Sequence, residues 1–130
     1  VRLLNLYNVK FNFVSPSQLA MPDHILNDLT RPFVCDTLIK KSLSETDVLY
    51  ITRVQKERFQ NKQLYEFVKD TYIIDKEVMK KTKENMILMH PFPRVGEISM
   101  DVDDDPRSVY FKQMKYGLCV RMALLTMVLS

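Results

Sequence analysis

A chain of 130 residues, 46% of them hydrophobic, is long enough to form one domain with its own core. Its 19 basic and 16 acidic residues give a net charge of +3, and the two signs are interspersed, unlike the concentrated basic surface of nucleic-acid-binding proteins. The most apolar stretch, residues 118–129, is about 12 residues long, whereas a membrane span needs roughly 20. We therefore expect a protein that binds neither nucleic acid nor a membrane.

The two cysteines, Cys35 and Cys119, do not indicate a secreted protein. Both lie in apolar runs without the close spacing of zinc ligands, and a secreted disulfide framework would use more cysteines. The amino terminus also lacks the charged head, long apolar stretch and cleavage site of a signal peptide. These features favour a reducing, cytoplasmic setting.

An acidic segment at residues 101–105 has the Asp-x-Asp-x-Asp spacing that begins a calcium-binding loop. Such a loop also needs a glycine and a glutamate at its sixth and twelfth positions, where this chain has Pro106 and Lys112. Gly-rich phosphate loops and zinc-ligand spacings are absent from the sequence as well. We therefore expect neither a bound metal nor a cofactor.

Short β-branched and aromatic runs alternate with longer stretches of helical periodicity, which is typical of βα units on a parallel sheet. This predicts the α/β class, with a three-layer, doubly wound, Rossmann-like parallel sheet. In chain order the sequence predicts a helix over 1–7, a strand over 10–14, a helix over 22–30, a strand over 32–35, a helix from 35 or 36 to 43, a strand over 47–51, helices over 63–72 and 76–84, a strand over 85–89 and a helix over 106–129. For the last helix, Asp105 is the expected cap and Pro106 the expected first residue.

Two polar segments, residues 52–58 and 90–94, directly follow strand-like apolar runs. Loops that leave the carboxyl ends of parallel strands converge on one crevice, where α/β proteins bind ligands. Arg53 and Gln55 project to the same side if the backbone stays extended, and a guanidinium with an amide matches a carboxylate. On spacing alone this pair is a weak signal, because a solvated loop has the same pattern. With the loops, it suggests a small anionic ligand.

The second segment begins with His90 and holds two prolines, Pro91 and Pro93. Proline has no N–H and a fixed φ, so the loop offers mainly carbonyl oxygens, held with little flexibility. Such a loop suits a ligand with N–H donors, although a simple strand-terminating turn would look the same. No carboxylate or nucleophile stands close to His90 in the sequence, so we expect at most a supporting role for it.

For three further charged residues the sequence allows either a functional role or simple exposure to solvent. Glu57 and Arg58 lie in a run of alternating charge, which is often only an exposed ion-pair cluster. Arg121 stands alone in an apolar helix segment, where a buried guanidinium would need a partner, so it either reaches solvent or meets an anion.

These segments resemble the aspartate transcarbamoylases (aspartate carbamoyltransferases), specifically the C-terminal, aspartate-binding domain of the catalytic chain. The similar stretches occur in the same order and at nearly the same separations, over almost the whole chain. They are residues 47–59, 89–95, 97–98, 110–111, Gly117 and 121–125.

The resemblance implies specific roles for the two polar segments. Arg53 and Gln55 would hold the carboxylates of L-aspartate. The carbonyl oxygens of Pro91 and Phe92 would accept hydrogen bonds from the carbamoyl amine and the aspartate amino group, and the bond between Phe92 and Pro93 would be cis.

The resemblance also assigns residues to closure of the two domains of such an enzyme. Arg58 would pair with acidic groups of the other domain, and Arg121 would make an interdomain or active-site contact. Glu57 either orients the neighbouring arginines or is merely solvated. Gly96 stands where the family usually has Asn or Asp, which removes a side-chain hydrogen bonder from the loop and loosens its backbone.

The implied activity is transfer of a carbamoyl group from carbamoyl phosphate to L-aspartate in pyrimidine biosynthesis. In the family the carbamoyl phosphate site and the catalytic histidine belong to an N-terminal domain, and the enzyme works as a homotrimer. No catalytic residue is therefore expected within these 130 residues, and the piece alone should be inactive.

Two other functions fit parts of the sequence. Ornithine transcarbamoylases are the nearest enzyme alternative, but they carry Cys where Pro91 stands and lack the pair formed by Arg53 and Gln55. The other is a non-catalytic, truncated domain that acts as an assembly or interaction module.

The domain expected over residues 1–130 begins partway through an element. Residues 1–4 read as the middle of a helix, because no Ser, Thr, Asp or Asn precedes them. In the family this helix follows a central strand of the sheet, and a sheet without that strand would leave two rows of backbone groups unpaired. We therefore expect either a fragment of a longer protein or a partner chain that supplies the strand.

Overall fold

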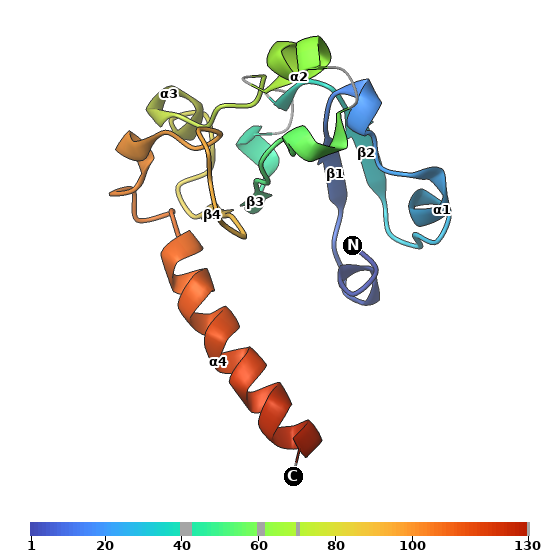
Figure 1. Cartoon of the computed structure of the whole chain (residues 1–130), viewed down its shortest axis with the longest axis vertical. Helices are drawn as coiled ribbons and strands as arrows, with labels where there is room; N and C mark the ends of the chain where they lie inside the picture. Colours follow the sequence, from blue (N-terminus) through green and yellow to red (C-terminus); the bar gives the residue numbers. More distant parts are fainter. Residues whose placement is uncertain (40–42, 60–61, 70, 130) are drawn as a thin grey trace. The chain divides into compact units, whose positions relative to one another are not determined.

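The computed structural model describes residues 1–39, 43–59, 62–69 and 71–129. The chain forms two compact units, Val1–Ser42 and Leu43–Ser130. In the described residues each unit has one pair of parallel strands together with several helices (Figure 1). Each unit is treated separately below.

Unit 1 is built on two parallel strands, β1 (Phe11–Val14) and β2 (Phe33–Asp36). Phe11 lies opposite Phe33 in the ladder, and the rings of Phe11 and Phe13 stack at 5.6 Å between centroids. The segments before and between the strands are short helices: η1 (Leu4–Leu6), η2 (Ser17–Leu19) and α1 (Asp23–Leu26).

Unit 2 contains the second parallel pair, β3 (Val48–Tyr50) and β4 (Ile87–Met89). Its helices are η4 (Leu43–Glu45), η5 (Lys56–Arg58), α2 (Lys62–Val68), α3 (Lys76–Met79), η6 (Met100–Val102) and α4 (Tyr110–Leu129). The core of this unit is made of fully or almost fully buried side chains from all of its parts: Leu43, Ile51, Val68, Ile74, Met79, Met86, Leu88, Ile98, Val102 and Tyr110.

The predicted strands are confirmed with small shifts at their ends, and so is their parallel pairing. The helix predicted from residue 35 or 36 to 43 is wrong over its described part. Cys35 and Asp36 belong to β2, because their β-type neighbours pair with β1, and Leu43–Glu45 is a single 3-10 turn. Residues 40–42 of that prediction lie outside the described part. The helix predicted over residues 1–7 is reduced to the 3-10 turn η1.

The last helix begins at Tyr110, four residues later than predicted, and Asp105 does not cap it. The carbonyl of Arg107 accepts a hydrogen bond from the Leu88 N–H (2.8 Å), and the Val109 N–H donates to the Leu88 carbonyl (3.0 Å). Ser108 thus forms an isolated parallel bridge with Leu88 of β4, and the chain turns into the helix only afterwards.

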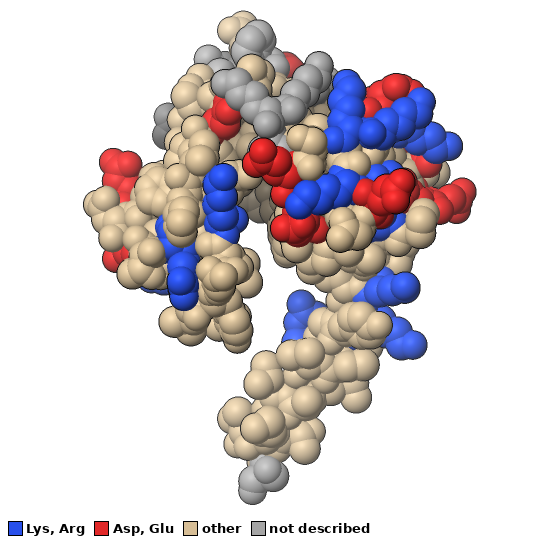
Figure 2. Space-filling view, turned by 180° about the vertical axis from the view of Figure 1, so that it is seen from behind, with Lys and Arg blue, Asp and Glu red and all other residues tan. Residues whose placement is uncertain are grey.

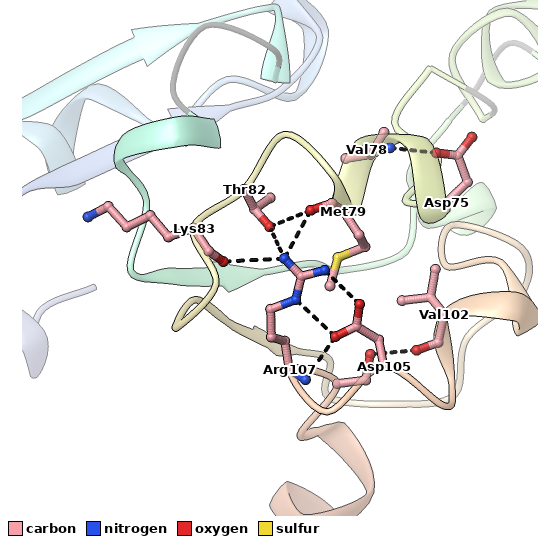
Figure 3. A network of polar contacts seen from close by, with 9 residues as sticks. Asp75, Val78, Met79, Thr82, Lys83, Val102, Asp105 and Arg107 are labelled. Atoms are coloured by element: carbon pink, nitrogen blue, oxygen red, sulfur yellow. Dashed lines mark hydrogen bonds and ion pairs between the residues drawn. The ribbon is translucent and has the colours of Figure 1, made fainter.

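The side chain of Arg107 stabilises this arrangement through a network of hydrogen bonds (Figure 3). Its Nε and Nη2 donate to the two carboxylate oxygens of Asp105, at 2.9 and 2.6 Å. Its Nη1 donates to the Met79 carbonyl (3.0 Å), the Thr82 hydroxyl (2.8 Å) and the Lys83 carbonyl (3.3 Å). One guanidinium thus ties the end of α3 and the following turn to the segment that pairs with β4.

Helix α4 leaves the rest of unit 2 with most of its apolar side chains exposed (Figure 1). Beyond Arg121 the helix has no charged residue, and its far end is free of charged side chains in the view of Figure 2. Exposed apolar surface of this extent is typical of sites that contact another protein, a membrane or a ligand. Within the described ranges, no helix combines the length and hydropathy needed to cross a membrane. The exposed side chains include Phe111, Met114, Tyr116, Leu118, Val120, Met122, Leu124, Leu125, Met127, Val128 and Leu129.

Candidate functional site

The two polar segments leave the sheet at one edge. Tyr50 lies opposite Met89 in the parallel ladder, and the Ile51 N–H donates to the Met89 carbonyl at 2.9 Å. Residues 52–58 and 90–97 begin directly after these positions. This confirms the prediction that both segments follow neighbouring parallel strands at their carboxyl ends.

A small cavity of about 80 Å³ lies between these two segments. Arg53 and Glu97 both line it, so it brings a guanidinium and a carboxylate to one space. Lys69, the residue after the end of α2, also lines the cavity and adds a second cation. Its ammonium pairs with Glu66 at 2.5 Å. The cavity is therefore polar, with an excess of positive groups. Its lining residues are Arg53, Val54, Tyr65, Lys69, Val95, Gly96 and Glu97.

Arg53 is held by Glu57, four residues later, with 3.3 Å between Nη2 and Oε1. The Arg53 side chain is half-buried at 32% exposure, whereas Glu57 is largely exposed. A hydrogen bond from its own backbone N–H lowers the pKa of the Glu57 carboxyl, and the charge of Arg53 lowers it further. An ionised Glu57 can thus orient the Arg53 guanidinium without blocking the donors on its other side.

Gln55 lies at the start of η5 with an extended backbone (φ −79°, ψ 108°) and is half-buried like Arg53. The neighbouring Lys56 ammonium lies over the Tyr65 ring, 5.8 Å from its centroid. The side chain of Arg58, for which the resemblance implies a role in interdomain closure, lies outside the described part of the structure.

The loop after β4 has an unusual backbone. The bond between Phe92 and Pro93 is cis, as the resemblance implied, and Phe92 has φ 51°, in the left-handed region. The Phe92 N–H donates to Nδ1 of His90 at 2.9 Å. The ring of Phe92 packs against His90, Tyr110 and Phe111, with centroid separations of 5.4, 5.6 and 5.6 Å.

His90 and Glu97 form a buried pair at the two ends of this loop. Nε2 of His90 lies 2.6 Å from Oε1 of Glu97, and the two side chains are 1% and 8% exposed. The second oxygen of Glu97 accepts the Val95 N–H at 3.0 Å. The backbone N–H of His90 donates to the side-chain carbonyl of Gln113 on α4 at 3.0 Å. Sequence reasoning gave His90 only a supporting role and assigned none to Glu97. The one available signal was a His and a Glu flanking a proline-rich loop.

A second pair fixes the far side of the loop. Both Nη atoms of Arg94 donate to the carboxylate of Asp103, and the hydroxyl of the buried Tyr110 donates to the same carboxylate. Hydrogen bonds from Arg94 lower the pKa of the Asp103 carboxyl, and hydrogen bonds to Asp103 raise the pKa of Arg94. Burial raises the pKa of Tyr110.

The lowered pKa of Asp103 predicts acid sensitivity. A carboxyl whose pKa is lower in the folded than in the unfolded state, where it is about 3.8, stabilises the fold above that value and loses this contribution as the pH falls through the folded pKa. We expect the difference in melting temperature between the wild type and Asp103→Asn to be constant from about pH 7 to 5 and to shrink below about pH 4. Thermal unfolding at several pH values measures it. A difference independent of pH down to about 3 would show that the ion pair does not stabilise the fold.

Arg121 lies apart from the Arg53 cavity. It is exposed on α4 and lines a wider, mainly apolar hollow of about 630 Å³ between α4 and β4, together with Ile87, Met89 and Tyr116. Its Nη1 lies 3.7 Å from the position that a Cβ on Gly117 would occupy. The described residues do not bring Arg121 to the other candidate site residues, so its role in closure stays a prediction.

Metal ligands do not gather anywhere in the described part of the chain: no group of three or more His, Cys, Asp or Glu residues there could hold an ion. Cys35 and Cys119 are exposed free thiols.

Parallel strands with polar loops at their carboxyl ends, an arginine beside a small cavity and a rigid carbonyl-rich loop together define an α/β ligand-binding domain. The family model for the aspartate/ornithine carbamoyltransferase Asp/Orn binding domain matches residues 1–128. The chain belongs to this family.

The chain resembles both a multifunctional protein and an enzyme subunit. It is 53% identical over 131 residues to the multifunctional protein pyr1-3 of Dictyostelium discoideum, covering 98% of the chain and 6% of that protein. It is 49% identical over 134 residues to the aspartate carbamoyltransferase catalytic subunit of Clostridium novyi, covering 100% of the chain and 44% of the subunit.

Among solved structures, aspartate transcarbamoylase from Trypanosoma cruzi in complex with carbamoyl phosphate and aspartate matches with a TM-score of 0.80. The sequences are 36% identical, and the match covers 92% of this chain and 41% of that one. This likeness confirms the predicted α/β fold. The chain thus spans less than half of the length of the relatives that it matches.

Proposed function

We propose that the chain is the aspartate-binding domain of an aspartate carbamoyltransferase, which transfers a carbamoyl group from carbamoyl phosphate to the amino group of L-aspartate in pyrimidine biosynthesis. The observation that carries the proposal is the polar cavity at the carboxyl edge of β3 and β4, which Arg53 shares with the end of the proline-rich loop. The relative from Trypanosoma cruzi, whose crystals contain both of these ligands, supports the substrates.

The chemistry of the transfer needs an electrophilic carbonyl, a neutral amine that attacks it, and positive groups around the leaving phosphate. Most of the acceleration then comes from positioning and electrostatics. In this domain Arg53 and Gln55 grip the carboxylates of aspartate, with Glu57 holding Arg53. The carbonyl oxygens of Pro91 and Phe92 receive the N–H groups of the two substrates, and Pro93 stiffens the loop behind them.

The other requirements are met outside these 130 residues. A second domain binds carbamoyl phosphate and supplies the catalytic groups. Arg58 and Arg121 contact that domain when the two close over the substrates. The complete enzyme is a cytoplasmic homotrimer.

The function is tested by assaying N-carbamoyl-aspartate formation with this chain alone and with the two-domain protein that also contains the carbamoyl-phosphate-binding half. We expect turnover of aspartate, and not of ornithine, by the two-domain protein, and none by the chain alone. Turnover of ornithine would place the chain in the other branch of the family. Turnover by the isolated chain would contradict the division of labour between the domains.

A non-catalytic assembly module is the second candidate, and the exposed apolar surface of α4 favours it. Light scattering of the purified chain, combined with a calorimetric titration with aspartate, separates the two. Self-association without aspartate binding supports an assembly module, whereas saturable binding of aspartate supports the substrate half-site.

A further inference from the structure

The hydrogen bonds around His90 fix which ring nitrogen carries its proton. A neutral imidazole has one donor and one acceptor nitrogen. The Phe92 N–H points at Nδ1 over 2.9 Å, so Nδ1 must be the acceptor. The proton is therefore on Nε2, which donates to Oε1 of Glu97 over 2.6 Å. In a doubly protonated ring, the Nδ1–H and the Phe92 N–H would be two donors that face each other without an acceptor.

The hydrogen bond to Nδ1 of His90 restrains Phe92, the residue of the loop with the least favourable backbone conformation. Phe92 has φ 51°, a left-handed conformation that is unfavourable for a residue with a side chain and persists only where the surroundings impose it. His90 restrains this conformation twice, through the hydrogen bond to the Phe92 N–H and through the contact between the two rings.

Glu97 completes the restraint from the other end of the loop. Its two carboxylate oxygens are used by the His90 ring and by the Val95 N–H, and its side chain is 8% exposed. A carboxylate that is this buried is tolerated only when its oxygens accept hydrogen bonds. Glu97 also lines the cavity that contains Arg53. The contact between His90 and Glu97 thus joins the two ends of the loop next to the candidate aspartate site.

We propose that His90 and Glu97 are positioning residues that fix the Pro91 and Phe92 carbonyl oxygens toward the N–H groups of the two substrates, among them the amino group of aspartate. This inference rests on the proposed function. The pair contributes to recognition of the amine, whereas Arg53 and Gln55 contribute to recognition of the carboxylates. Loosening the loop therefore weakens ligands that carry the amine and spares ligands that lack it.

Succinate is the discriminating probe, because it has the two carboxylates of aspartate but no amino group. The test measures dissociation constants of aspartate and succinate by calorimetry, in the two-domain enzyme saturated with a phosphonate analogue of carbamoyl phosphate. His90→Gln keeps a donor toward Glu97 and loses the acceptor for Phe92, whereas His90→Asn keeps an acceptor near Phe92 and does not reach Glu97. His24→Gln, at an exposed position of α1, is the matched control.

We expect His90→Gln to weaken aspartate about tenfold or more, the loss of roughly one buried hydrogen bond, and to change succinate by less than about threefold. His90→Asn should weaken aspartate less than His90→Gln does, and His24→Gln should change neither ligand. An equal loss for both ligands would reduce the pair to a structural role, and an unchanged aspartate affinity would overturn the proposal. If the wild type binds neither ligand, the proposed function itself fails.

A measurement on the wild type keeps the proposal testable if the variants do not fold. Nitrogen-15 NMR of histidine in the intact enzyme distinguishes the two tautomers and the charged ring. A neutral His90 with its proton on Nε2 is expected. A proton on Nδ1 would contradict the hydrogen bond to Phe92 and with it the proposal, whatever the enzyme binds.

Discussion

Replacing Arg53 by alanine is expected to weaken aspartate binding by about 100-fold or more. A guanidinium bound to a carboxylate through two hydrogen bonds contributes about 1.5–3 kcal/mol for each, and removing both corresponds to a factor of roughly 100 to 10,000 in affinity. The loss also changes the charge of the cavity, where Glu97 would face the ligand with one cation fewer. Titration of the two-domain enzyme with aspartate measures the effect, and KM for aspartate should rise in parallel.

Two variants show whether the geometry of Arg53 matters as well as its charge. Arg53→Lys keeps the charge without the planar fork, so it should lose less affinity than alanine does and still bind clearly more weakly than the wild type. Lys56→Ala removes a cation from the next turn, whose ammonium lies over the Tyr65 ring but is not itself part of the cavity lining, and should leave aspartate affinity unchanged. Comparable losses for Lys56→Ala and Arg53→Ala would show that only the overall charge of the segment is recognised.

The strands could be predicted from the sequence because each is a short β-branched or apolar run. In these segments the tertiary contacts agree with the local preference for a strand. Residues 48–50 and 87–89 are also paired in parallel, so the prediction that their loops meet at one edge was confirmed. This much follows from local pattern and from the rule that parallel strands end at the same edge.

The helix boundaries could not be predicted, because tertiary hydrogen bonds override local propensity. Asp105 and Pro106 form a good start signal, yet the backbone after them pairs with Leu88 and Asp105 is used by Arg107. The ladder position opposite Leu88 depends on a residue about 20 positions away, which no local window contains.

The candidate site was predictable in its parts but not in its restraints. The sequence identified Arg53, Gln55 and the prolines, since each has a chemical character that a ligand can use. It did not identify the link between His90 and Glu97, because the two residues are seven positions apart and meet only through the tertiary path of the loop, in which Phe92 is left-handed. The roles of Arg58 and Arg121 stay predictions, since they concern a second domain.

Replacing Arg107 by alanine is expected to lower the free energy of unfolding by about 3 kcal/mol, against a typical total of about 5–15 kcal/mol for a folded domain. The variant leaves the Asp105 carboxylate without its counter-ion and removes the guanidinium donor from the carbonyls of Met79 and Lys83 (Figure 3). The two carbonyls keep only their hydrogen bonds from Thr82 and from the Met86 N–H. The carboxylate is 21% exposed and the guanidinium 18%, so solvent compensates only in part. Urea unfolding of the two-domain protein measures the loss.

The matched control is Lys80→Ala, which removes an ion pair of the same 2.6 Å length from the surface, where its side chains are 69% and 70% exposed. No measurable change is expected there, because water replaces the contact. Folded Arg107→Ala should still bind aspartate with nearly wild-type affinity, since the guanidinium lies outside the lining of the Arg53 cavity. A stability loss equal to that of Lys80→Ala would show that the network does not brace β4, and a selective loss of aspartate affinity would place Arg107 in the binding machinery instead.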